Sequence, residues 1–154
     1  MEIQYLQSLK NNPSRDGRIN IPLTQTEILE LEQLYNNSNP FPKALKELLF
    51  LAGDYCIVMD YGISNSQQEF QDFVREDLLE FGKVFTRPFY AVETYSNDYI
   101  IFLYLDEGDN PKLYCAYYND EAAGFNQPLK QIDHTLSSLV NNRIQRVKEG
   151  VNPF

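Results

Sequence analysis

The sequence predicts an α+β fold: a single domain whose mostly antiparallel sheet packs against helices from both ends of the chain. Three observations predict it. Three strand-like segments lie close together between residues 89 and 118, and the links between them are rich in Asn, Asp, Gly and Pro. Apolar residues recur at helical spacing both before and after these segments. A length of 154 residues suits one domain with a sizeable core.

The three strands are expected at residues 89–95, 99–105 and 113–118, and they would form an antiparallel meander. Their links favour turns, because Asn, Asp and Gly tolerate left-handed backbone and Pro fixes φ. The middle strand is apolar or aromatic at every position. We therefore expect both of its faces to be covered by other parts of the domain. A further short strand or buried extended segment is expected at residues 56–59, which are apolar throughout.

Helices are expected on the N-terminal side of the sheet. A short helix at residues 1–9 would precede a polar stretch that favours turns, so residues 1–17 are expected to be a loosely attached extension. The core would then span about residues 24–147. Thr24 and Glu27 have the spacing of a capping box, in which each side chain satisfies a backbone amide. The apolar positions of the helix that follows are Ile28, Leu31, Leu34 and Tyr35.

Two further helices follow from the same periodicity. One starts near Pro42 and ends at Gly53, a favourable residue just beyond a helix end. The other starts at a second capping pair, Ser66 and Glu69. Its apolar face is expected to comprise Phe70, Phe73, Val74, Leu78 and Phe81. Its outer face is acidic and carries Glu69, Asp72, Glu76, Asp77 and Glu80 against a single cation, Arg75.

The last part of the chain is expected to be a long loop followed by a helix. Residues 119–131 contain single Gly and Pro residues and lack a clear periodicity, and loops of this length are often functional or mobile. Apolar residues at helical spacing predict the final helix at residues 132–147, with Asp133 as its N-cap.

Charge narrows the classes of partner. The formal net charge is −9, which argues against nucleic acid or an anionic membrane as partner, because either would repel the protein. The charge permits a basic protein partner, or it simply keeps the protein soluble. The N-terminus has no basic segment leading into an apolar run, and no apolar run approaches the roughly 20 residues that cross a membrane. A cytoplasmic protein is expected.

Residue types that carry chemistry are sparse. His134 is the only histidine, and Cys56 and Cys115 are far apart in the sequence, so a zinc site or a histidine-based catalytic site is not expected. Residues 106–110 resemble a calcium loop, but they lack its alternating ligands and its final Glu. No glycine-rich phosphate loop occurs. The sequence therefore predicts a protein that is not an enzyme, with no catalytic residue, cofactor or metal.

Surface carboxylates are the remaining candidates for a binding site. In a meander, Asp98 lies at the end of the sheet where the third strand leaves, so it is expected near Asp120 and Glu121. A second group gathers at the opposite end of the meander and comprises Asp106, Glu107 and Asp109. Either group could receive a basic partner, or could be an ordinary solvated edge of the sheet.

The order of these elements resembles the SUKH superfamily. A capped helix leads into NPFPKALKELLFLAG at residues 39–53, which resembles the N-terminal signature of that superfamily. The later stretch RPFYAVETYSNDYIIFLYLDEGDNPKLYCAYYND, at residues 87–120, resembles its central strands. The likeness covers residues 24–147 and departs from the pattern at Gly53, which Asp54 follows instead of a second glycine.

The resemblance implies a non-enzymatic immunity protein that binds and neutralises a toxin domain, possibly a nuclease, by covering its active surface. The toxin would be basic, and the immunity protein would be a monomer or a weak homodimer. The alternative is a regulatory interaction module like the fungal regulator of cell-wall synthesis in the same superfamily. A third possibility, from the many carboxylates alone, is a hydrolase that the motifs do not reveal. A toxin gene beside this one would favour the first reading.

Overall fold

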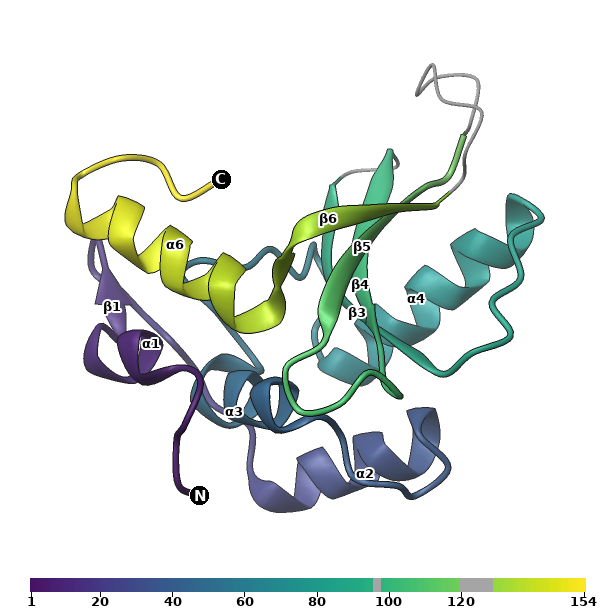
Figure 1. Ribbon diagram of the computed structural model, residues 1–154, viewed down its shortest axis with the longest axis horizontal. Coiled ribbons are helices and arrows are strands. Elements are labelled where there is room, and N and C mark those ends of the chain that lie inside the picture. The colour runs from purple at the N-terminus through teal and green to yellow at the C-terminus, as the bar shows by residue number, and fades with distance from the viewer. Residues whose placement is uncertain (96–97, 120–128) are drawn as a thin grey trace.

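The structure is a computed structural model, which describes residues 1–95, 98–119 and 129–154, and it confirms the α+β fold (Figure 1). Helices and strands of a single domain enclose one four-stranded antiparallel sheet with the order β3-β4-β5-β6. A separate hairpin, β1-β2, lies near the N-terminus. In chain order the elements are α1 (Gln7–Asn11), β1 (Ser14–Arg15), β2 (Arg18–Ile19), α2 (Gln25–Tyr35), α3 (Lys43–Ala52), α4 (Gln67–Glu80), β3 (Phe89–Tyr95), β4 (Tyr99–Tyr104), β5 (Lys112–Tyr117), β6 (Leu129–Thr135) and α6 (Leu136–Lys148).

The predicted meander is present as β3, β4 and β5. Cross-strand pairs such as Tyr95 with Tyr99 and Tyr99 with Tyr117 define its register. A bulge between Ala91 and Glu93 shifts the register of β3. From Ile100 onward every residue of β4 is buried. This confirms that both faces of the middle strand are covered.

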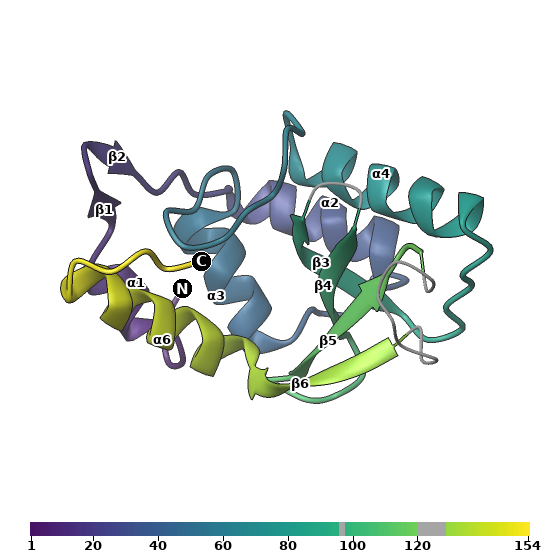
Figure 2. The ribbon, with the colours of Figure 1, turned by 90° about the horizontal axis from the view of Figure 1, so that it is seen from above.

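Helices cover the two faces of the sheet, with α4 on one side and α3 and α6 on the other (Figures 1 and 2). The face under α4 forms a smaller core, in which α4 places Phe70, Val74 and Leu78 against the sheet. The opposite face belongs to a larger core that also takes in residues of α1, α2 and α3. Alternate residues of each strand therefore contribute to different cores.

The outer edge of β3 is closed by side chains of α4. Gln71 forms a fork: its Nε2 donates to the carbonyl of Ala91 at 2.8 Å, and its Oε1 accepts from the amide of Ala91 at 3.0 Å. Arg75 donates to the carbonyl of Phe89 at 2.9 Å. These bonds satisfy backbone groups that would otherwise be open to another strand. The same contacts turn the guanidinium of Arg75 inward, over the rings of Tyr35 and Phe89.

The helix starts are largely as predicted. Thr24 and Glu27 form the complete capping box, with the amide of Thr24 donating to Glu27 Oε2 at 2.7 Å. Ser66 caps α4 by accepting from the amide of Glu69 at 3.1 Å. The carboxylate of Glu69 reaches back to the amide of Asn65 rather than to that of Ser66.

The N-terminal segment corrects the expectation that residues 1–17 are loosely attached. Leu6 and Leu9 are fully buried in the larger core. The carboxylate of Glu47 on α3, also fully buried, accepts from the amides of Gln4, Tyr5 and Leu6 at 2.7, 2.8 and 2.9 Å. The helix itself, Gln7–Asn11, is shorter and starts later than expected, and the three amides that bond to Glu47 come just before it.

The start of the last helix is also corrected. Residues Leu129–Thr135, expected as the end of the loop and the start of the helix, form β6, which pairs with β5. The helix α6 begins at Leu136. Thr135 is the N-cap in place of Asp133, and it forms a reciprocal capping box with Ser138. The sequence could not reveal this boundary, because the strand pairs with a partner in the chain and not with its own neighbours. Part of the expected loop, residues 120–128, lies outside the described residues.

The predicted segment at residues 56–59 is buried but is not a strand. Tyr55 makes an isolated bridge to Ile21. Beyond it the backbone turns, and its polar groups bond to side chains: the amide of Ile57 to Asn20 Oδ1 at 2.9 Å, and the carbonyl of Val58 to Arg143 at 2.8 Å. Side chains thus supply the backbone hydrogen bonds that a neighbouring strand would otherwise supply.

Candidate functional site

The two predicted acidic groups are placed differently by the structure. Asp98 is exposed at the end of the sheet where β5 ends, since its carbonyl accepts from the amide of Tyr118 at 3.0 Å. Asp120 and Glu121, its expected neighbours, lie outside the described residues. The structure therefore brings Asp98 to the expected place and leaves the rest of this group a prediction.

The second group is partly neutralised within the protein. Arg87 forms ion pairs with both Asp106 and Glu107, the latter at 3.1 Å. Hydrogen bonding from Arg87 lowers the pKa of the Asp106 carboxyl below its usual value. Tyr114 donates to Glu107 at 2.8 Å. Asp109 is exposed, although its carbonyl accepts from the amide of Ala44. A partner would have to displace Arg87 to use most of this charge.

A stronger acidic surface lies along the outer face of α4. Its residues share one side of the helix, because they are spaced by three or four positions. We call this surface the α4 strip, and it consists of Glu69, Asp72, Phe73, Glu76 and Glu80. Phe73 was expected in the core, but 45% of its surface is exposed. The buried ridge runs instead through Phe70, Val74 and Leu78.

The signal for Phe73 was present in the sequence. Phe73 is four residues after Glu69 and three before Glu76, so it belongs on the acidic side of the helix. Phe81, also expected in the core, is 47% exposed beyond the end of α4. Leu34 on α2 is likewise 55% exposed. Apolar character alone therefore overestimated the core at these positions.

The charge of the α4 strip is largely uncompensated. Glu76 and Glu80 have no hydrogen-bond or ion-pair partner among the residues that the structure describes. Asp72 accepts from the hydroxyl of Tyr35 at 2.6 Å, a bond that leaves its charge in place. Burial raises the pKa of the nearby Asp77 carboxyl, and the charges of Glu80 and Glu76 raise it further.

Two surface hollows flank Phe73. One, of about 610 Å³, lies between the start of α4 and residues 60–65. The other, of about 450 Å³, lies along the helix and is lined by polar and acidic residues. Phe73 and Glu69 line both hollows, so they form the wall between them. An aromatic ring between two hollows and among carboxylates is suited to contact with a protein.

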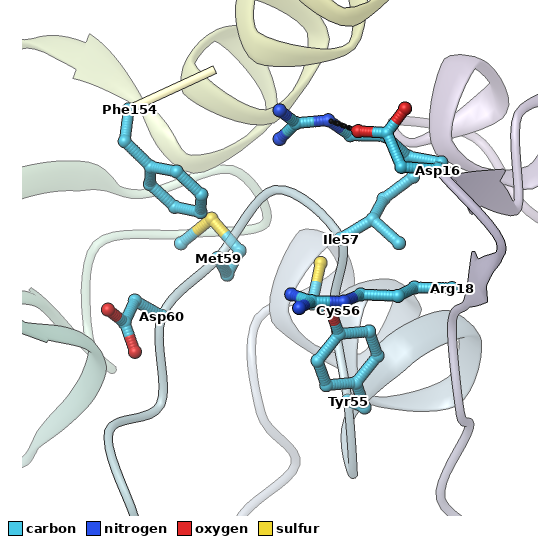
Figure 3. Close-up of a pocket in the computed structure, with 9 residues that line it drawn as sticks. Asp16, Arg18, Tyr55, Cys56, Ile57, Met59, Asp60 and Phe154 are labelled. Atoms are coloured by element: carbon cyan, nitrogen blue, oxygen red, sulfur yellow. Dashed lines mark hydrogen bonds and ion pairs between the residues drawn. The ribbon is translucent and has the colours of Figure 1, made fainter. Parts of the chain in front are cut away.

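A third pocket, of about 440 Å³, lies away from α4 and is shown in Figure 3. The β1-β2 hairpin, the segment before α4 and the C-terminal residue build it. Its lining is of mixed charge and comprises Arg15, Asp16, Arg18, Tyr55, Cys56, Ile57, Met59, Asp60 and Phe154. Arg15 pairs with Asp16 at 3.1 Å. Burial raises the pKa of the Cys56 thiol to about 12, so the thiol is not a nucleophile at neutral pH.

The closest approach to a catalytic pair is His134 with Ser138. His134 Nδ1 is 3.1 Å from Ser138 Oγ. However, Ser138 Oγ donates to the carbonyl of Thr135 and accepts from the amide of Thr135. The hydroxyl therefore serves the cap of α6. Within the described part of the chain, no hydrogen bond from a third group orients the imidazole, as a nucleophilic pair requires.

In residues 1–95, 98–119 and 129–154, no group of three or more His, Cys, Asp or Glu side chains is placed to hold a metal ion. None of the helices in that part of the chain is both long and apolar enough to cross a membrane. Comparison with protein-family models, curated proteins and solved structures found no match. The resemblance to the SUKH superfamily therefore stays a prediction.

Proposed function

We propose that this chain is a non-enzymatic immunity protein that binds a basic toxin domain through the α4 strip. The observation that supports the proposal is the exposed ring of Phe73 beside Glu76 and Glu80, two carboxylates without an ion pair among the residues that the structure describes. An acidic surface of this kind attracts a basic surface, and an aromatic side chain at its centre supplies contact area.

Desolvation favours this surface over the other acidic group. Among the described residues, Glu76 and Glu80 have no ion pair that a partner must break, whereas a partner at Asp106 would first have to break the ion pair with Arg87. The free energy needed to break such a pair reduces the net binding free energy of the new contact. The hollows on either side of Phe73 offer space for apolar or cationic side chains of the partner.

Inhibition would work by occlusion. A partner that binds nucleic acid or another anionic substrate needs a basic surface, and the α4 strip would cover that surface with opposite charge. This mechanism requires no chemistry from the immunity protein itself. It requires only that the complex live long enough to keep the partner from its substrate. The lifetime of the complex is set by the dissociation rate, which must therefore be slow.

The proposal is tested by affinity purification of the tagged protein from its own cells at low salt, followed by mass spectrometry and binding measurements with the purified partner. We expect one stoichiometric partner with a basic domain whose toxicity this protein suppresses. Phe73→Ala should weaken binding by at least about 2 kcal/mol if the ring is a central anchor. Glu76→Lys should weaken it as well.

Glu30→Lys is the matched control, because it makes the same charge change on an exposed position of α2. It should leave binding close to that of the unmodified protein. Equal effects of Glu76→Lys and Glu30→Lys would refute a role for the α4 strip. Recovery of several regulatory or cell-envelope proteins, without any toxic partner, would favour the regulatory module instead.

A further inference from the structure

The pocket in Figure 3 has opposite charges on opposite sides. In this view Asp60 lies at one side and the guanidinium of Arg18 at the other, with Met59 between them, and Ile57 lines the same pocket. Arg18 is exposed, and no ion pair or hydrogen bond engages its side chain within the described ranges. Arg15, in contrast, is already paired with Asp16. Arg18 and Asp60 are therefore the charges that a ligand could use.

We propose that this pocket binds a small zwitterionic ligand of dipeptide size. The carboxylate of the ligand bonds to Arg18, and its amino group bonds to Asp60. An apolar side chain of the ligand lies against Ile57, Met59 and Phe154. A free amino acid carries both charges on one carbon atom, whereas a dipeptide separates them by roughly one further residue, about 3.5 Å. Charges on opposite walls therefore fit the dipeptide better.

The floor of the pocket is held in place before any ligand arrives. The amide of Ile57 bonds to Asn20 Oδ1 at 2.9 Å, and the amide of Asp60 bonds to Glu93 at 3.1 Å. Arg143, buried below, donates to the carbonyl of Val58. A floor fixed in this way loses little entropy when a ligand binds, which favours binding by a small site.

The carboxylate of Asp60 is also held in one orientation. Asp60 Oδ1 accepts from the amide of Gly62 at 2.9 Å, and this bond orients the carboxylate. A pocket of about 440 Å³ lies within the range of roughly 300–1,000 Å³ that is usual for small-molecule sites. A simple anion is a poorer fit, because Asp16 and Asp60 would repel it.

The probe for the test is glycyl-L-leucine, titrated into the full chain by calorimetry and by NMR, with its N-acetyl and C-amide derivatives in parallel. We expect saturable binding that shifts the amide signals of Ile57 and Asp60. Arg18→Ala should weaken the dipeptide about tenfold, as loss of a hydrogen bond to a charged group does. The same substitution should change the affinity for the C-amide little, because the C-amide has no carboxylate to bond to Arg18. Asp60→Asn should likewise weaken binding of the dipeptide, and it should change little for the N-acetyl derivative, which has no charged amino group.

Lys10→Ala is the matched control, because it removes an exposed cation of α1 that does not line the pocket. It should bind glycyl-L-leucine as the unmodified chain does. The proposal is overturned if the dipeptide gives no saturable signal, or if the C-amide binds as tightly as the free dipeptide. Neither result would bear on the α4 strip, because none of its residues lines this pocket; the larger hollow beside Phe73 shares Asp60 with the pocket.

Discussion

Gly53 shows how close packing can require a glycine in ordinary helical backbone. Its φ is −76°, so no left-handed conformation demands glycine there. The requirement comes from its neighbours: a Cβ on Gly53 would lie 2.5 Å from the carbonyl oxygen of Leu49 and 2.7 Å from Leu23 Cγ. The sequence singled out Gly53 as a helix end, but its contact with Leu23 follows from the tertiary structure.

We predict that Gly53→Ala destabilises the fold more than Gly82→Ala does. Gly82 has a φ of +70° with nothing near its Cβ position, so alanine there costs only backbone strain, about 1–2 kcal/mol. At Gly53 the backbone itself must move. Urea unfolding of both variants measures the difference. Equal losses would contradict this prediction, because the contacts with Leu49 and Leu23 would then cost no more than the backbone strain at Gly82.

A buried ion pair joins β3 to α6. Glu93 is fully buried, and both its oxygens accept from Arg143, one of them at 2.9 Å. Arg143 also donates to the carbonyl of Val58 and to the hydroxyl of Tyr95. Burial opposes the charge of Arg143, yet the hydrogen bonds and charge of Glu93 raise its pKa above the ordinary value.

Glu93→Gln is expected to destabilise the protein by about 3–5 kcal/mol, because it leaves the buried guanidinium without a counter-charge. The double variant Glu93→Leu with Arg143→Met should lose less, since it removes both charges together. Chemical denaturation of the three proteins measures this. If the double variant were the less stable, the bonds to Val58 and Asp60 would matter more than the charges.

At the scale of elements, α4 has two different sides. Its inner side closes the edge of β3 and fills the smaller core, while its outer side gathers like charges around Phe73. Burial raises the pKa of the neighbouring Asp77 carboxyl, and repulsion from Glu80 and Glu76 raises it further. The like charges of the outer side repel one another in the free protein, and a cationic partner that covered them would replace this repulsion with attraction.

We predict that Asp77→Asn stabilises the protein at neutral pH, by less than about 1 kcal/mol because the group is largely solvated. A raised pKa means that the folded state binds the proton more tightly than the unfolded state does. The stability from this site is therefore present at low pH and is lost as the pH rises through the folded pKa. The gain should vanish near pH of about 3, below the ordinary Asp pKa. A gain that persists there would point to a cause other than charge.

At the scale of the whole molecule, charge is divided between two ends. The elements α1, β1, β2 and the end of α6 lie at one end, and α4 lies at the other (Figures 1 and 2). The first end carries the cations Lys10, Arg18, Arg146 and Lys148, together with Arg15, which is paired with Asp16, and the acidic residue Glu149. The second end carries the α4 strip. An approaching basic partner would be attracted more strongly to the α4 end than to the other.

This division predicts association that depends steeply on salt. The rate constant for binding the basic partner should fall about tenfold or more between roughly 0.01 M and 0.15 M salt, whereas the dissociation rate should change little. Stopped-flow mixing at several salt concentrations measures both rates. Glu76→Lys should reduce the slope more than Glu30→Lys does. Association that does not vary with salt would rule out electrostatic steering.

Local features were predictable from the sequence because their causes lie within a few residues. The capping box at Thr24, the α+β class and the covered strand β4 all follow from spacing and residue type. The outer face of α4 was identified as acidic for the same reason. The place of Asp98 beside the end of β5 also followed, since a meander reverses at each link.

Only the tertiary structure decided what depends on partners distant in the chain. Glu47 binds the N-terminal amides, and pairing with β5 makes a strand of the residues before Leu136. The pocket between Arg18 and Asp60 likewise joins segments that the sequence keeps apart. Periodicity tells which residues are apolar, but burial depends on what packs against them. The sequence by itself therefore determined the α+β class, the central meander and the acidic character of this protein, because these depend on local spacing and composition. Tertiary packing decided the ends of several elements and which side chains are exposed, because these depend on contacts between distant segments.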